Sequence, residues 1–307
     1  MEYHEPVLLQ PAIGLLVTNP DGVYVDGTLG GGGHSFHLLQ SAGPECRCIG
    51  FDVDPVAIAF ASARLKTFGS RFTAIQSNTA LMEEGLYRLG IRKVDGILLD
   101  LGVSSRQLDD ESKGFTFRKD TRLDLRLDPS LPETAESWIN TRSFEEIDRV
   151  LRENGEEPYS RKVASAIIKA REKGPVLSTG ALTDIIDTVI FPDKRKKTYA
   201  RVFQAIRMEI NKEMDRLKEM LQAGTGLLKP GGRLVVISYH SLEDRMVKTW
   251  FRDRENPCTC PPGLPVCICG KKPELKVLTR KAVMPDDEEL KTNPRSRSAR
   301  LRAAEKC

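Results

Sequence analysis

The chain has 307 residues, of which 40% are hydrophobic and 29% are charged, and its formal net charge is +4. This apolar content is high enough to build a sizeable core, which excludes a chain that stays unfolded for lack of one. The mild positive charge alone is weak evidence for nucleic-acid binding. No apolar run approaches the roughly 20 residues of a membrane span. The first ten residues carry Glu2 and Glu5 and lack the basic-then-apolar pattern of a secretory signal. We therefore expect a cytoplasmic protein.

The first hundred residues alternate apolar strands with helical patterns. Strands are predicted at residues 23–26, 48–51, 72–75 and 94–101, and helices at 34–41, 55–67 and 80–89. This rhythm indicates a parallel sheet covered by helices on both faces. A helical pattern replaces it between residues 105 and 199, with candidate helices at 133–140, 144–152, 160–173 and 179–189.

The strand pattern returns in the last third of the chain. A long helix is expected over residues 200–228, and the Pro230-Gly-Gly turn then leads into a fifth strand. Residues 275–281 and 299–304 are candidates for a closing pair of strands. We predict a cofactor-binding domain formed by residues 1–104 and 200–307, with residues 105–199 inserted as a helical domain that recognises RNA.

Four consecutive glycines, residues 30–33, follow the first strand in the segment DGTLGGGGHS at residues 26–35. Glycine permits a tight turn and close backbone approach to a ligand at the carboxyl end of a parallel strand. Asp52 ends the second strand 22 residues beyond Gly30, where an acid accepts hydrogen bonds from ribose hydroxyls (52 − 30 = 22). The alternatives for Asp52 are a helix cap or a surface turn, although Asp54 before Pro55 is the better cap.

The cofactor predicted by this loop is a methionine-derived nucleoside. A dinucleotide fingerprint beginning at Gly30 would need glycine at position 35, which is Ser35. Asp26 would repel a diphosphate and attract an ammonium group. Asp100 ends the fourth strand and either caps the following segment or accepts a hydrogen bond from a substrate amine or the cofactor.

Several motifs then resemble the ribosomal RNA small-subunit methyltransferase H family, and they span nearly the whole chain in order. They are HEPVLL at 4–9, DGTLGGGGHS at 26–35, DGILLDLGVSS at 95–105, QLDD at 107–110, GFTF at 114–117, RVFQAIR at 201–207, PGGR at 230–233, SYHSLEDR at 238–245 and NPRSRS at 293–298. The resemblance implies a Rossmann-like class I methyltransferase with a mostly parallel seven-stranded sheet. It also implies transfer of a methyl group from S-adenosylmethionine to N4 of a cytidine in small-subunit (16S) ribosomal RNA.

The resemblance carries site residues with it. The expected cofactor contacts are Gly32, Gly33, His34, Asp52, Thr79, Asp100 and Gln107. The family often has an aromatic residue at the position of Thr79, which leaves adenine stacking there open. Asp100, Tyr239 and His240 are the candidate catalytic residues: Asp100 as acceptor for the amine, Tyr239 stacking on the base, and His240 accepting a proton. Structural alternatives are packing for Tyr239 and a hydrogen-bonded bridge for His240.

The implied partner is small-subunit ribosomal RNA, as naked RNA or within an assembled subunit, and a homodimer is left open. Two basic clusters are candidate phosphate contacts: residues 194–197 with Arg201 and Arg207, and the arginines at 295, 297, 300 and 302. Other readings of the chain are an RNA-binding ribosome-assembly factor and a nucleotide-dependent oxidoreductase.

Four cysteines form two Cys-x-Cys pairs, Cys258 with Cys260 and Cys267 with Cys269. They form either a zinc site or a loop of reduced thiols. We assign no metal ligands from the sequence, and nothing in it suggests a catalytic metal.

Overall fold

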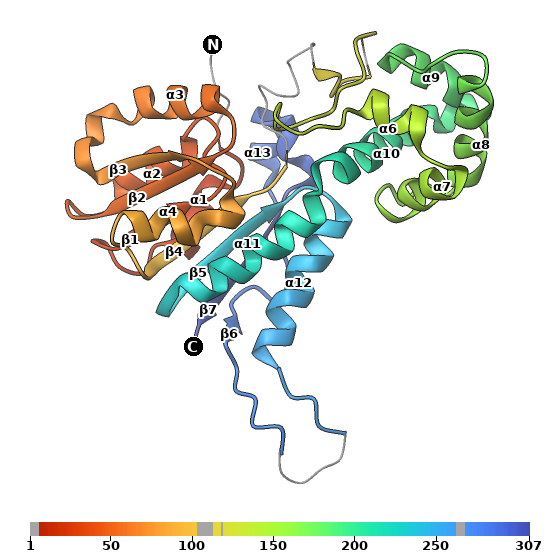
Figure 1. Ribbon diagram of the computed structural model, residues 1–307. Helices are drawn as coiled ribbons and strands as arrows, with labels where there is room; N and C mark the ends of the chain where they lie inside the picture. The colour runs from red at the N-terminus through yellow and green to blue at the C-terminus, as the bar shows by residue number, and fades with distance from the viewer. Residues whose placement is uncertain (1–5, 103–112, 118, 262–267) are drawn as a thin grey trace. The chain divides into compact units, whose positions relative to one another are not determined.

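The computed structural model describes residues 6–102, 113–117, 119–261 and 268–307. The chain divides into two units (Figure 1): the sheet unit, Met1–Gly102 with Arg216–Cys307, and the inserted unit, Val103–Asp215. Within the described residues, no helix combines the length and apolarity that a membrane crossing requires.

The sheet unit is built on seven strands in the order β3-β2-β1-β4-β5-β7-β6. The strands are β1 (Val23–Asp26), β2 (Arg47–Asp52), β3 (Phe72–Gln76), β4 (Val94–Asp100), β5 (Leu228–Ser238), β6 (Leu275–Val277) and β7 (Arg300–Lys306). The first five run parallel, whereas β7 is antiparallel to both β5 and β6. The strand order reverses at β1, so the carboxyl ends of β1, β2 and β4 border the crevice where such sheets bind ligands.

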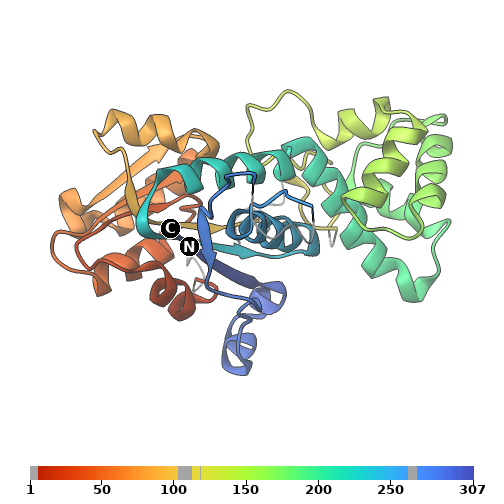
Figure 2. The ribbon, with the colours of Figure 1, turned by 90° about the horizontal axis from the view of Figure 1, so that it is seen from below.

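Helices cover both faces of this sheet, as the sequence predicts. They are α1 (Leu9–Leu16), α2 (Gly33–Ser41), α3 (Pro55–Arg64), α4 (Met82–Arg88), α11 (Glu213–Leu227), α12 (Ser241–Glu255) and α13 (Asp287–Thr292), with short helices η1 (Lys66–Arg71), η2 (Thr79–Leu81) and η4 (Pro294–Ser298). Apolar residues of α1, α2 and α3 share one core with β4, β5 and β7. Figure 2 shows α11 on the opposite face, where its Gly224 lies against Ile97 and Leu234.

The inserted unit consists of helices around a core of its own. They are α6 (Ala135–Thr141), α7 (Phe144–Glu153), α8 (Ser160–Arg171), α9 (Thr179–Asp187) and α10 (Pro192–Asn211). Trp138 of α6 is buried in this core together with apolar residues from every one of these helices. A capping box begins α7, where Ser143 and Glu146 satisfy each other's backbone N–H groups.

Two predicted boundaries are corrected by the structure. The second half of the sheet unit begins at Arg216 rather than at residue 200, because α10 buries Val202, Phe203 and Ile206 in the core of the inserted unit. The helix expected over 200–228 is two helices, broken at Lys212, whose φ of 50° is left-handed. The predicted closing pair of strands is confirmed as β6 and β7.

Candidate active site

The glycine loop joins β1 to α2 at the carboxyl end of the sheet. Gly30 and Gly32 have φ values of 49° and 70°, a region that side chains other than glycine rarely adopt. A Cβ atom on Gly32 would lie 3.0 Å from Leu65, and one on Gly33 would lie 2.5 Å from Pro6. The loop therefore needs glycine at positions 30 and 32 for its backbone conformation and at position 33 for space.

Asp52 lies beside this loop at the end of β2. Its Oδ2 accepts the Gly30 N–H at 2.8 Å, and its Oδ1 accepts the Asp54 N–H at 2.9 Å. Burial raises the pKa of the Asp52 carboxyl. Each oxygen keeps a further lone pair, so the carboxylate still accepts hydroxyl hydrogen bonds. Asp54 caps α3 by accepting the Val56 N–H at 2.9 Å, as its position before Pro55 predicts.

His34, in the first turn of α2, connects the glycine loop to the end of β4. Its Nε2 donates to the Val7 carbonyl at 3.0 Å, since a carbonyl only accepts. Its other ring nitrogen, Nδ1, lies 3.8 Å from Asp100 Oδ2. His34 is buried, so this contact forms one wall of the environment of Asp100.

Asp100 is held by two hydrogen bonds. Its backbone N–H donates to Thr28 Oγ1 at 2.6 Å, and its Oδ1 accepts the Tyr239 hydroxyl at 2.8 Å. Burial raises the Asp100 pKa to about 6, and His34 and Tyr239 oppose that rise. Burial and the neighbouring Asp100 carboxyl raise the pKa of Tyr239 well above its ordinary value, so the phenol remains a donor. The side chain of Asp100 is 24% exposed, so the carboxyl group is only partly buried.

Tyr239 and His240, at the end of β5, make contacts of the kind expected for their structural alternatives, and their catalytic roles stay predictions. The Tyr239 ring packs beside Gly102, whose added Cβ would lie 3.2 Å from it, and against the core of the sheet unit. His240 caps α12: its Nδ1 accepts the Glu243 N–H at 3.3 Å, and its Nε2 lies 3.2 Å from Glu243 Oε1. Both ring nitrogens of His240 therefore face the start of its own helix.

Three remaining sequence candidates have different outcomes. Thr79 is buried, and its hydroxyl donates to the Gly27 carbonyl, so it fixes the start of the glycine loop. Asp26 lies beneath the loop and accepts from the Ser35 hydroxyl at 2.6 Å and the Thr28 N–H at 3.3 Å, while burial raises its pKa. Gln107 lies outside the described residues.

Some residues of the site were missed by sequence reasoning. Thr28 and Ser35 anchor Asp100 and Asp26, and buried Glu243 accepts the Tyr239 N–H at 2.9 Å. The signal for Glu243 was present, because a cap followed three residues later by glutamate is a capping-box pattern. A threonine and a serine inside a glycine loop carry no comparable signal.

The ends of β1, β2 and β4 thus place three carboxyl groups around one glycine loop: Asp26, Asp52 and Asp100. Such a set repels phosphates and attracts a cation. S-Adenosylmethionine combines ammonium and sulfonium charges with ribose hydroxyls, so the acceptors present at Asp52 and Asp100 fit this cofactor.

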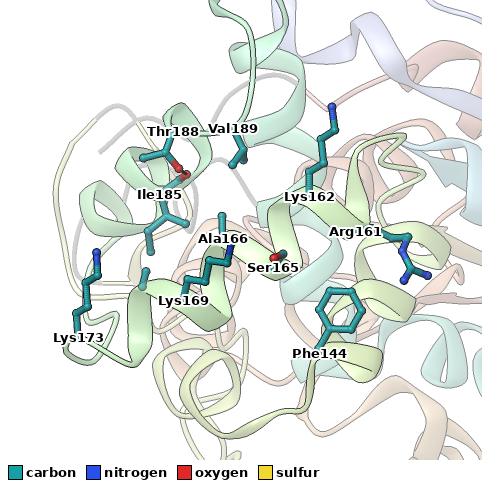
Figure 3. A pocket seen from close by; sticks show the side chains of 11 residues that line it. Phe144, Arg161, Lys162, Ser165, Ala166, Lys169, Lys173, Ile185, Thr188 and Val189 are labelled. Atoms are coloured by element: carbon teal, nitrogen blue, oxygen red, sulfur yellow. Dashed lines mark hydrogen bonds between the residues drawn. The ribbon is translucent and has the colours of Figure 1, made fainter.

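The inserted unit carries a separate feature, a groove of about 690 Å³ between α8, α9 and the start of α7 (Figure 3). Four cations line it: Arg161, Lys162, Lys169 and Lys173. Among the described residues, no carboxylate lies within ion-pair distance of any of the four. Arg161 stacks over the Phe144 ring at 5.5 Å, which adds an aromatic face to the groove. All four cations fall within one predicted helix, residues 160–173, yet they were not predicted to contact phosphate.

The two basic clusters predicted from the sequence are partly neutralised. Arg207 forms a two-point ion pair with Glu213, and Arg302 is 8% exposed and pairs with Asp244 at 2.6 Å. The prediction that Arg302 contacts phosphate is therefore wrong, because its guanidinium is buried against a carboxylate.

Comparison with known proteins identifies the chain. Its whole length, residues 1–307, matches the model of the MraW methylase family. Proteins named ribosomal RNA small subunit methyltransferase H are similar throughout: that of Carboxydothermus hydrogenoformans is 51% identical over 100% of this chain and 99% of its own length. Those of Lachnospira eligens and Heliobacterium modesticaldum are 48% and 46% identical, each covering at least 99% of this chain and 98% of its own length.

The predicted resemblance, fold class and cofactor are confirmed, and the oxidoreductase alternative is set aside. The match covers both units, so the acidic glycine-loop site and the inserted helices are both parts of what the family shares. The chain therefore belongs to the MraW methylase family and is an S-adenosylmethionine-dependent methyltransferase.

Proposed function

We propose that this methyltransferase modifies N4 of a cytidine in small-subunit ribosomal RNA. The names of the relatives support the RNA, and the environment of Asp100 supports an amine as the methyl acceptor. The main support is that Asp100 is an acceptor held in place by Thr28 and Tyr239, with a side chain that is 24% exposed.

An exocyclic cytosine amine is a poor nucleophile because its lone pair is delocalised into the ring. An acceptor on one N–H favours the more tetrahedral nitrogen that attacks a methyl group, and a fixed acceptor does this without reorganisation. Asp100 Oδ2 meets this need, since Tyr239 already occupies Oδ1. S-Adenosylmethionine, when bound, supplies the electrophilic methyl group.

The raised pKa of Asp100 suits this role. At about 6, it leaves the carboxylate ionised at neutral pH yet more basic than an ordinary aspartate. The proton lost by the amine is then accepted at Oδ2, where His34 Nδ1 lies 3.8 Å away. The chain's own contribution is therefore an oriented acceptor and a place for one proton.

The basic groove of the inserted unit supports RNA as the substrate. Phosphate contacts need cations that are not already paired with carboxylates, and the four cations of the groove meet that condition among the described residues. The Arg161 guanidinium, which lies over the Phe144 ring, offers a plane on which an unpaired base stacks. A paired cytidine hides its N4 group, so single-stranded or extruded RNA is the form that this enzyme needs.

The decisive experiment is methyl transfer from radiolabelled S-adenosylmethionine to small ribosomal subunits lacking the modification. Wild type, Asp100→Ala and the control Asp253→Ala, which removes an exposed carboxylate of α12, are compared, and the labelled nucleoside is identified by mass spectrometry. We expect N4-methylcytidine with wild type and control, and at least about 100-fold less with Asp100→Ala. Cofactor binding without any labelled RNA would favour the assembly-factor reading instead.

A further inference from the structure

The connection between α12 and β6, residues 256–274, carries the cysteines that the active site does not use. It is longer than the roughly 12–15 residues that compact domains usually allow between elements without a function for the loop. Its base is closed by a hydrogen bond from the Glu274 N–H to the Arg254 carbonyl at 2.9 Å. Figure 1 shows its described arms extending away from the sheet.

Three sulfur atoms meet between these arms. The Sγ atoms of Cys258, Cys260 and Cys269 all lie within 4.8 Å of one another, and those of Cys258 and Cys269 are 3.9 Å apart. A disulfide would bring the latter pair to about 2.05 Å. Tetrahedral zinc with Zn–S bonds of about 2.3 Å separates its sulfur ligands by about 3.8 Å. The observed spacing therefore matches that of metal ligands, and Cys258 and Cys269 are free thiols in this structure.

The backbone around the cluster also favours thiolates. The Ile268 N–H donates to Cys260 Sγ at 3.4 Å, the kind of contact that stabilises a metal-bound sulfur from outside the ligand set. Gly270 follows Cys269 with a φ of 67°, so the chain turns sharply just after this ligand.

Hydrophobic burial does not account for this gathering. None of the described residues of the connection is buried, and Ile268 is 78% exposed. Ordering such a segment against its conformational entropy requires another source of free energy. A structural metal supplies it, because binding and ordering are then one process.

We propose that Cys258, Cys260 and Cys269 bind a structural zinc ion that holds together the two described arms of the connection, residues 256–261 and 268–274. Thiolates select Zn²⁺ over the hard ions Mg²⁺ and Ca²⁺, and a structural zinc site fills four positions. The described residues supply three of them. Cys267, two residues before Cys269 in the sequence, lies outside the described residues and is kept as cysteine in every variant below.

The test is zinc content of the full chain, purified under reducing conditions without chelator and measured by mass spectrometry of the metal. We expect about one zinc ion per chain, falling below about 0.2 in Cys258→Ser, Cys260→Ser and Cys269→Ser. Cobalt loaded into the metal-free wild type should show sulfur-to-metal charge-transfer absorption. Zinc removal should speed proteolysis within residues 256–274. The temperature at which the sheet unit unfolds should stay unchanged.

Cys307→Ser and Thr259→Ala are the matched controls, since one removes an exposed thiol elsewhere and the other changes the residue between two ligands. Both should keep wild-type zinc content. Wild-type chain that takes up no zinc from a zinc buffer, holds iron instead, or joins Cys258 to Cys269 in a disulfide would overturn the proposal. Equal loss of zinc in the controls would overturn it as well.

Discussion

The Tyr239 hydroxyl donates to Asp100 Oδ1 at 2.8 Å and so ties the end of β5 to the end of β4. The phenol opposes the rise that burial imposes on the Asp100 pKa. Because these two strands are neighbours in the sheet, the contact fixes the acceptor from one side and leaves Oδ2 for the substrate. Tyr239 is thus a positioning residue whose effect should be visible in pH dependence.

Tyr239→Phe should shift the acid limb of methyl transfer upward by about one pH unit, because a hydrogen bond that favours the charged Asp100 is lost. Activity in the wild type should rise through pH about 6, the pKa of Asp100. The variant should therefore lose most activity near pH 6 and recover near pH 8.5. An unchanged pH profile would contradict this role and show that Tyr239 acts only through the packing of its ring, which phenylalanine keeps.

Asp100→Asn should stabilise the cofactor-free protein at neutral pH while abolishing transfer. The folded pKa of Asp100 is raised above its unfolded value, so the folded state binds protons more readily and the ionised group disfavours folding as pH rises. The gain in the free energy of unfolding should be absent below pH about 4, grow as the pH rises from there, and be complete above pH about 6–7. Thermal unfolding at pH 4 and pH 8 measures it, and no difference between the two pH values would contradict the assignment.

Arg302→Ala should destabilise the sheet unit by about 2–4 kcal/mol. The buried Asp244 carboxylate would then keep only the more exposed Arg300 as an ion-pair partner. Arg302 lowers the Asp244 pKa, so the contribution of the pair exists above the ordinary aspartate pKa and is lost as pH falls through the lowered value. Urea unfolding of the variant, beside Arg295→Ala as a control in the same predicted cluster, tests this. Equal stability of the two variants would show that the ion pair contributes nothing.

Lys169→Ala with Lys173→Ala should weaken RNA binding across sequences and reduce the slope of log affinity against log salt by about 0.7 for each lost phosphate contact. Both lysines line the groove of the inserted unit. Lys66→Ala with Arg88→Ala removes the same charge from exposed positions of the sheet unit and should leave that slope unchanged. Filter binding to small-subunit RNA at several salt concentrations compares the pairs, and identical slopes would exclude the groove as a phosphate site.

Periodicity predicted β4 within one residue of its bounds because this strand is buried on both faces and reads as a continuous apolar run. The break at Lys212 was invisible because it depends on distant contacts. The side chain of Asn211 accepts the Leu127 N–H and donates to the Leu125 carbonyl, and no local glycine or proline marks the place.

In the active site, too, features set by local sequence were predicted, whereas features set by distant contacts were not. Spacing alone placed Asp52 beside the glycine loop, since the chain must pass through one helix between adjacent parallel strands. It did not reveal that Thr28 holds the backbone of Asp100, because hydroxyl contacts depend on side-chain rotamers. Nor did it reveal the basic groove, which forms only when α8 packs beside α9.

The position of β7 between β5 and β6 bears on how the protein is made. Residues 300–306 leave the ribosome last among the strands, yet they occupy an interior place in the sheet. Until they arrive, β5 and β6 each present an unpaired edge, and such edges recruit strands from other chains. A nascent or prematurely terminated chain is therefore exposed to aggregation late in synthesis, and a fusion partner at the carboxyl end needs a linker that leaves β7 free to enter the sheet.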